Sequence, residues 1–270
     1  MHGQEDLERE LRRFFENLRE RKCSVDEIKV KVLAANFVES LPELIRFPSV
    51  NDMKVGRDRT ANFYLQMFRE KHYVAFKSSP NGNCFFNALS VRLFGNESFS
   101  LNIKYITLKY IVNNYENLKI VQPSVGADTV DETLIACAYW GGYSNLLTMH
   151  CAAAALNVGI INAFAPFNGI CESNFCHVQR TFNLRRSRAT CYIFWYPFSS
   201  EVNSSGQYNL NHFVPLIRKN SVPEDQITVY DSDEAFSGAE SDEECGEGVQ
   251  WAESVDSEDE VKMYIYYRIF

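Results

Sequence analysis

The sequence predicts a mixed α/β (α+β) fold in which helices cover a small central sheet. Apolar residues recur at helical spacing through most of the chain up to residue 157, and three short runs rich in β-branched and aromatic residues follow. With 270 residues, 46% of them hydrophobic, the chain is long enough to bury a substantial core. Helices followed by strands in this order favour a small, well-covered sheet.

Three helices are expected near the N-terminus. Residues 5–20 carry one apolar stripe on an otherwise charged helix. The next helix opens at Ser24, with Glu27 in capping-box spacing, and is expected to continue to a break near Pro42. Residues 59–73 have the pattern of a third helix.

The middle of the chain predicts further helices. One begins at Cys84, directly after a Pro/Gly/Asn turn, and Gly95 is placed to end it. Residues 101–118 repeat the helical pattern. Residues 131–157 predict a helix pair, interrupted at Gly141–Gly142.

The predicted strands lie in the second half of the domain. They are the runs VGIINAFAP, TCYIFWYPF and HFVPLI, at residues 158–166, 190–198 and 212–217. Each is short and bounded by Asn, Gly, Ser or Pro, as strands of a small sheet usually are.

Charge divides the chain into parts. The formal net charge is −8, but residues 224–260 hold 15 Asp and Glu and no Lys or Arg, whereas residues 1–223 carry 25 basic and 20 acidic side chains. A segment so acidic, without apolar periodicity, is typical of a disordered tail. We therefore expect an N-terminal helical extension (1–50), a catalytic domain (51–222), an acidic tail (223–260) and an apolar C-terminal segment (261–270).

Composition also bounds location and cofactors. No run approaches the 18 apolar residues of a membrane span, and the N-terminus is charged where a secretory signal would be apolar. We expect an intracellular protein, cytoplasmic or nuclear, with reduced thiols and no membrane partner. The C-x4-C-H run at Cys171 and Cys176 lacks a second ligand pair, so neither a metal nor another cofactor is expected.

Cys84 is the candidate nucleophile. A helix N-terminus, with its free amides and positive dipole end, lowers the pKa of a thiol there. The turn at Asn81, Gly82 and Asn83 carries amides that can point at one site, as an oxyanion hole requires. The alternative is that Cys84 is a small buried residue that happens to start a helix.

His212 is the best-placed of the five histidines to act as a base. It begins the run HFVPLI after a polar loop, so its ring is expected at the rim of the sheet, open to substrate. By contrast, His150 lies within a helical run of small and apolar residues, where a packing role is expected.

These two motifs resemble those of the ovarian-tumour (OTU) cysteine proteases. NGNCFFNALS is similar to the family signature D-G-N-C-[LF]-[FY]-x-A-[LS], and NHFVPLI follows about 130 residues later. The ending HFVPL is closest to the A-twenty and Cezanne-like branch. The stretch AYWGGYSNLL also resembles OTU-like domains of transposon-associated and vertnin-like proteins. The resemblance covers roughly residues 52–219 and implies a papain-type fold.

The resemblance implies a deubiquitinase that needs no metal. Cys84 matches the family nucleophile, His212 its general base, and Asn81–Asn83 its oxyanion loop. The implied reaction is hydrolysis of the isopeptide bond at the C-terminus of ubiquitin or a ubiquitin-like protein.

The residue that orients the histidine is left open. Asn81 stands where the family usually has Asp, and Val214 stands where many members place an orienting Asp or Asn. In the branch that HFVPL resembles, this Asp lies upstream of the nucleophile. Asp52 and Asp58 both lie upstream, and Asp52 is the first candidate because its distance from Cys84 along the chain is nearer to the family's. Asp58 and Asn211 are the alternatives.

A short motif after the predicted domain indicates a further partner. Ile227, Val229 and Tyr230 precede acidic residues and resemble a SUMO-interaction motif, or else they complete the domain's own sheet. The net charge argues against nucleic acid as a partner. The alternative function is a catalytically inactive OTU-like domain that serves as a ubiquitin-binding or chromatin-associated module.

Overall fold

The structure is a computed structural model. It describes residues 2–35, 37, 41, 45–67, 72–121, 124–125, 128–164, 179–182, 189–196 and 212–219. All of these belong to the unit Met1–Glu224. Asn211, the SUMO-type motif at 227–230, the acidic tail and the apolar C-terminal segment lie outside the described residues, and the division into domains stays a prediction.

Helices make up most of the described chain. They are α1 (His2–Glu20), α2 (Val25–Ala34), the short 3-10 helix η2 (Val50–Asp52), α3 (Arg59–Met67), α4 (Cys84–Phe94), α5 (Ser100–Asn113), α6 (Tyr115–Val121), α7 (Val130–Ala138) and α8 (Leu146–Leu156). Local sequence explains several of their ends. The predicted capping box at Ser24 and Glu27 is present, and Gly95, at φ 80°, ends α4 by donating its amide to the Val91 carbonyl.

The strands form one small sheet and a separate pair. They are β1 (Tyr73–Ala75), β2 (Ser124–Val125), β3 (Asp128–Thr129), β4 (Gly159–Phe164), β5 (Gln179–Phe182), β6 (Thr190–Tyr196) and β7 (His212–Arg218). The sheet has the order β1-β7-β6-β4-β5, and β2 pairs with β3. Only β4 and β6 run parallel in it, and the register of β6 with β7 places Tyr196 opposite His212.

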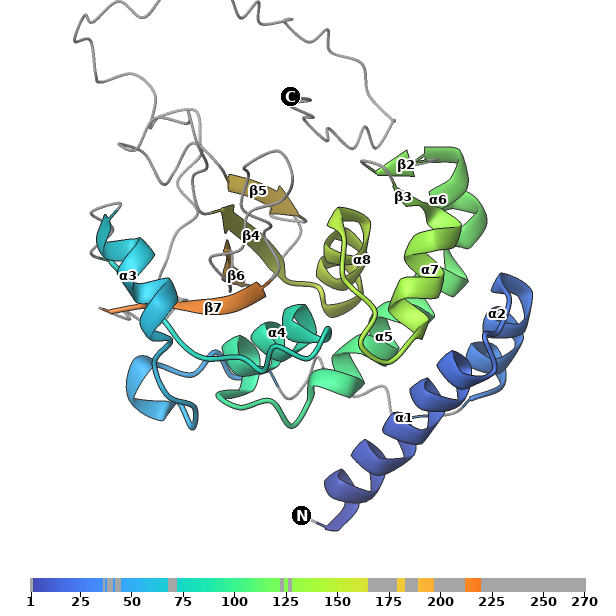
Figure 1. Cartoon of the computed structure of the whole chain (residues 1–270), viewed down its shortest axis with the longest axis horizontal. Coiled ribbons are helices and arrows are strands. Elements are labelled where there is room, and N and C mark those ends of the chain that lie inside the picture. Colours follow the sequence, from blue (N-terminus) through green and yellow to red (C-terminus); the bar gives the residue numbers. More distant parts are fainter. Residues whose placement is uncertain are drawn as a thin grey trace, which may run out of the picture. The chain divides into compact units, whose positions relative to one another are not determined.

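Helices cover both faces of this sheet, as predicted (Figure 1). On one face, Ala61 and Leu65 of α3 pack with buried residues of β6 and β7 such as Phe194 and Val214. On the other face, Val91 of α4 packs with residues of β1 and β7. Because α4 lies along β7, the start of one element is brought to the start of the other.

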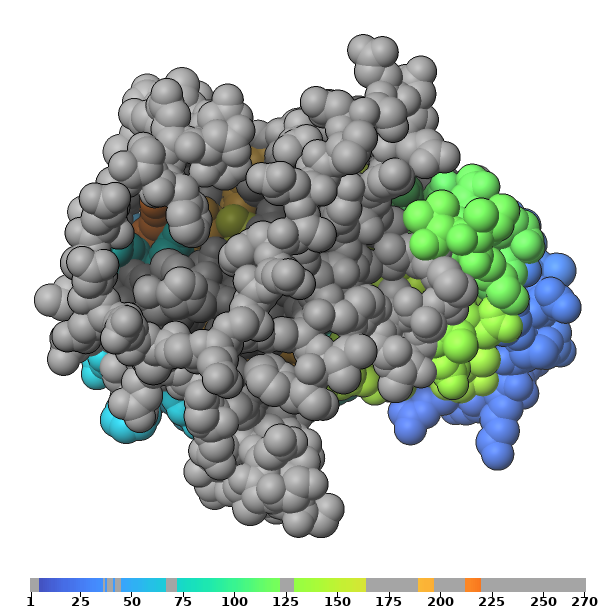
Figure 2. Space-filling view, turned by 90° about the horizontal axis from the view of Figure 1, so that it is seen from above, coloured from blue at the N-terminus to red at the C-terminus, as the bar shows by residue number. Residues whose placement is uncertain are grey.

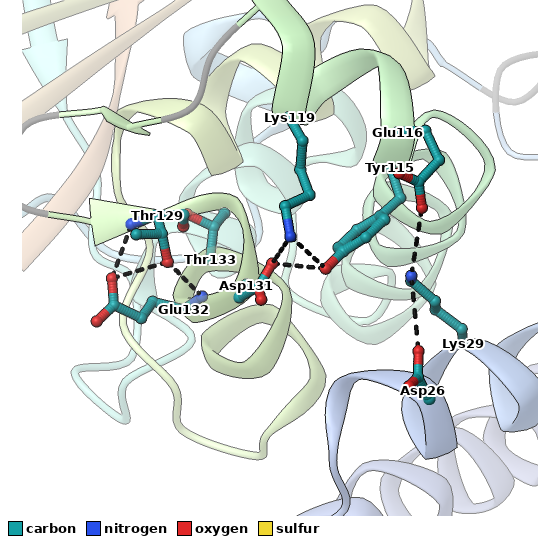
Figure 3. Close-up of polar contacts among 9 residues, drawn as sticks. All are labelled: Asp26, Lys29, Tyr115, Glu116, Lys119, Thr129, Asp131, Glu132 and Thr133. Carbon is teal, nitrogen blue, oxygen red and sulfur yellow. Dashed lines mark hydrogen bonds and ion pairs between the residues drawn. The ribbon is translucent and has the colours of Figure 1, made fainter.

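The N-terminal helices pack on the helical side of the molecule. Helices α1 and α2 both contact α5 and α7, and their blue surface adjoins the green surface of α6 and α7 in Figure 2. Of the apolar stripe predicted on α1, Leu11 and Leu18 are buried, and Phe15, outside the predicted stripe, is buried as well. On the exposed side, α7 begins with a capping box formed by Thr129 and Glu132 (Figure 3).

Several predicted boundaries are corrected by tertiary contacts. Helix α2 ends at Ala34, short of the predicted break near Pro42, and the Tyr105 hydroxyl donates to the Ala35 carbonyl there at 3.0 Å. Residue 73, predicted as helical, begins β1 because it pairs with β7. The predicted helix at 101–118 divides at Asn114 into α5 and α6. The sequence reading also missed β5 and the β2–β3 pair.

Candidate active site

The turn before α4 is held by the side chain of Asn81. Its Oδ1 atom accepts hydrogen bonds from the backbone amide of Asn83, at 3.1 Å, and from the side chain of Asn87, at 3.0 Å. An Asp at this position would use the same acceptor atom. Asn81 therefore supplies the bonds that shape this turn without the charge of the family's usual residue.

The backbone of this turn lies directly against a second glycine turn. Gly82 has φ 76°, and a Cβ atom added to it would lie 2.2 Å from the carbonyl oxygen of Gly141. Gly142 is equally crowded, since its Cβ atom would lie 1.9 Å from the Ala136 carbonyl oxygen. The glycines of both turns are thus required by close backbone approach, which explains the Trp-Gly-Gly stretch noted in the sequence.

Cys84, the first residue of α4, is 3% exposed, and its thiol contacts the beginning of β7. Burial raises the pKa of the thiol. Hydrogen bonds from the backbone amides of Phe213, Phe85 and Cys84 itself act in the opposite direction. Since Phe213 follows His212 in β7, the structure brings the predicted nucleophile to the strand end that carries the predicted base.

His212 lies at the start of β7, as predicted, but it is buried. Its side chain is 1% exposed, although the sequence predicted a ring open at the rim of the sheet. The ring packs edge-on against Tyr196 at 5.6 Å, and Nε2 lies 3.5 Å from the hydroxyl of Ser78. Burial lowers the pKa of His212, while the charge of Asp58 and a hydrogen bond with the backbone of Ser78 raise it.

The two upstream aspartates have different environments. Asp52 is exposed, and its carboxylate accepts bonds from the amide and hydroxyl of Ser49, which lower its pKa. Asp58 is buried. It caps α3 by accepting the Ala61 amide at 2.8 Å, and it accepts a bond from the hydroxyl of Tyr196 at 3.2 Å. Tyr196 also contacts His212, so Asp58 and His212 share this neighbour.

No family model matches this chain. Two curated proteins match part of it, both named OTU domain-containing protein 1. The mouse protein (Mus musculus) is 32% identical and the human protein (Homo sapiens) 30% identical, each over 114 residues that cover 38% of this chain. The chain contains an OTU-family domain. The matched part of the chain spans 24% of the length of the mouse relative and 22% of that of the human one.

Solved OTU domains are also similar to this OTU domain. The structure of the OTUD1 OTU domain has a TM-score of 0.40 and 20% identity, and the match covers 59% of this chain and 99% of that one. An OTU domain in complex with ubiquitin has a TM-score of 0.38 and 11% identity, over 66% of this chain and 88% of that one.

Aromatic side chains flank Cys84 in the OTU domain. Trp195 stacks on Phe213 with ring centroids 4.9 Å apart and donates a hydrogen bond to the hydroxyl of Tyr143 at 2.7 Å. Burial raises the pKa of Tyr143, and the nearby Cys84 thiol adds to this effect. A cavity of about 270 Å³ lies on another side of the turn, lined in part by Asn81, Asn83 and Trp140.

The part of the chain that the structure describes contains no group of three or more His, Cys, Asp or Glu side chains able to hold a metal ion. None of its helices is long and apolar enough to cross a bilayer.

Two residues near Cys84 were missed by the sequence reading. Ser78 precedes the turn and contacts both His212 and the Phe213 carbonyl, and no spacing rule identifies it. Lys104 is fully buried on α5 and donates to the side chain of Asn83. A signal for Lys104 was present, since it falls on the apolar stripe of α5, where a lysine requires an explanation.

Proposed function

We propose that this OTU domain is a cysteine hydrolase that cleaves isopeptide bonds at the C-terminus of ubiquitin or a ubiquitin-like protein. The observation that carries the proposal is the contact of the Cys84 thiol with the backbone beside His212. The substrate class is the one that the family resemblance implies.

In the proposed reaction, His212 takes the thiol proton and the Cys84 sulfur attacks the carbonyl carbon of the isopeptide bond. The backbone amides of Gly82 and Cys84 stabilise the negative oxygen that forms, because the amides of Asn81 and Asn83 already donate to the Ser79 carbonyl and to Asn81 Oδ1. His212 then gives its proton to the departing lysine amine, leaving a thioester. Water, deprotonated by His212, hydrolyses the thioester and regenerates the thiol.

Burial decides the resting state of the proposed pair. It raises the pKa of Cys84 and lowers that of His212, so a neutral thiol and a neutral imidazole are favoured over an ion pair. His212 therefore acts as a general base during attack, and its charge then needs a partner. We propose Asp58 for this role, with Ser78 holding the Nε2 side of the ring.

The alternative is a non-catalytic OTU domain that binds ubiquitin. The observation that favours it is the same burial, because Cys84 and His212 are only 3% and 1% exposed. A substrate must reach both groups for catalysis, whereas a binding module has no such requirement.

A ubiquitin probe with a C-terminal electrophile separates the two functions. We expect the full chain to form a covalent adduct, seen as a mass increase of one probe per protein, and Cys84→Ala to abolish it. Cys151→Ala is the matched control, because Cys151 is buried in α8 away from β7, and this variant is expected to keep the adduct. Folded protein that forms no adduct with any ubiquitin-like probe would exclude the hydrolase.

A further inference from the structure

Lys104 is a buried ammonium directly behind the turn that precedes Cys84. It is 0% exposed, and its Nζ atom donates to Asn83 Oδ1 at 2.6 Å and to the Tyr139 carbonyl at 2.7 Å. The rings of Phe15 and Phe86 lie 5.2 and 5.6 Å away. No carboxylate among the described residues forms an ion pair with it.

Burying an ammonium group without a counter-ion costs free energy, because the group loses its contact with water. The two hydrogen bonds of Lys104 therefore need a functional explanation. Burial lowers the pKa of Lys104 to about 8, and the nearby Cys137 side chain offsets only part of this effect. A leucine or methionine would fill the same apolar stripe without this cost. What only a cation supplies here is a strong donor to Asn83.

The bond to Lys104 fixes the side chain of Asn83. A lysine can only donate, so the atom facing it must be the amide oxygen of Asn83. Asn83 is 1% exposed, and its backbone immediately precedes Cys84 in the chain. Its carbonyl accepts the Asn87 amide at 2.9 Å, which starts the hydrogen bonding of α4. Holding Asn83 therefore holds the first turn of that helix.

That first turn presents amides to the Cys84 sulfur. Backbone hydrogen bonds from Cys84 and Phe85 are among the contacts that lower the thiol pKa against the effect of burial. Their benefit depends on direction, because a hydrogen bond weakens steeply when its angle is lost. A fixed Asn83 keeps these amides aimed at the sulfur.

The N-terminal helix belongs to the same arrangement. Phe15 of α1 covers Lys104, and the Arg19 guanidinium donates to the Trp140 carbonyl at 3.1 Å. Arg12 lies over the Trp140 ring, 4.7 Å from its centroid. The turn that supports Gly82 and the lysine that supports Asn83 are thus both covered by α1.

We propose that Lys104 is a positioning residue for Cys84, acting through Asn83. A role in catalysis rests on the proposed function, whereas the effect of Lys104 on the Cys84 thiol can be measured without it. The amides of Cys84 and Phe85 stabilise the thiolate only while Lys104 holds Asn83 in place.

The test is the pH dependence of Cys84 alkylation by iodoacetamide, followed by peptide mass spectrometry. We expect Lys104→Met and Asn83→Ala each to shift the profile to higher pH by about half a unit or more. Because both act on one bond, the double variant should shift no further than the larger single change. Lys119→Met, which removes an exposed lysine from α6, is the matched control and should leave the profile unchanged.

The alkylation profiles test the proposed role of Lys104 directly. Unshifted profiles in both single variants, or shifts that add in the double variant, would overturn the proposal. If Lys104→Met does not fold, Asn83→Ala alone decides by the same criterion. The ubiquitin probe is applied to the same proteins, so a wild type that forms no adduct but shows the expected alkylation shifts would refute the hydrolase and leave the role of Lys104 standing.

Discussion

Two lysines of this chain, Lys104 and Lys119, have opposite environments. Lys119 lies on the surface, where its Nζ atom is 3.1 Å from the Asp131 carboxylate and 3.3 Å from the Tyr115 hydroxyl (Figure 3). These bonds raise its pKa. Lys104 is buried with neutral oxygen acceptors, and burial lowers its pKa to about 8. Lys119 is exposed and has a counter-ion, whereas Lys104 is buried and has no counter-ion among the described residues.

The two environments have different consequences for the stability of the fold. Exposed pairs such as Lys119 and Asp131 contribute little, because water and salt compete with them. A buried cation without a counter-ion opposes folding, and it is kept where its directional bonds serve another purpose. Lys104, near Cys84, is a cation of this buried type. Lys119 forms an ordinary surface ion pair.

The largest expected effect is on stability at high pH. The pKa of Lys104 is lower in the folded protein than in the unfolded chain. The free-energy cost of burying its charge is therefore fully present below pH 8 and is lost as the pH rises towards 10.5. The unfolding free energy of the wild type minus that of Lys104→Met should therefore rise by on the order of 2 kcal/mol between pH 7.5 and 10.

Urea unfolding of both proteins at the two pH values measures this difference. Other groups that titrate in this range are common to both proteins and cancel. Cys137, which faces Lys104, has a pKa raised by burial to about 12 and stays neutral throughout. A difference that does not change with pH would mean that Lys104 titrates as an exposed lysine does.

Much of the structure around Cys84 could be predicted from the sequence, because the residues that determine it are close together in the chain. The turn before Cys84, the glycine after α4, the break at Gly141–Gly142 and the strand that opens with His212 each carry their own short-range cause. The burial of His212 was not predictable, because it arises from Tyr196 and Ser78, which approach it from distant parts of the chain.

The upstream aspartate shows the same limit. Asp52 was preferred for its distance along the chain, but its carboxylate is turned to Ser49. Asp58 has a local signal too, since it caps α3, yet that signal predicts only a helix start. Its charge raises the pKa of His212 only because the tertiary structure brings the two residues near each other, with Tyr196 contacting both.

A smaller effect is expected from the two aspartates on the rate of probe reaction. Asp58→Asn can keep the cap to the Ala61 amide through its one amide oxygen, and its NH2 group then faces the Tyr196 hydroxyl as a donor. The substitution removes the charge that favours the imidazolium form of His212. We expect the adduct to form at least about tenfold more slowly. Asp52→Asn, the matched exposed control, should react at the wild-type rate. A slower Asp52→Asn together with an unaffected Asp58→Asn would reverse the assignment.

The smallest effect is expected at the surface pair. Lys119→Met removes the ion pair with Asp131, and its loss of stability should be smaller than the pH-dependent change at Lys104. Because solvent screens this pair, the wild type and the variant should unfold at the same urea concentration in 1 M NaCl. Lys104 is shielded from salt by protein, so the difference between wild type and Lys104→Met should persist in the same buffer. Equal salt sensitivity of the two variants would show that burial does not distinguish these lysines.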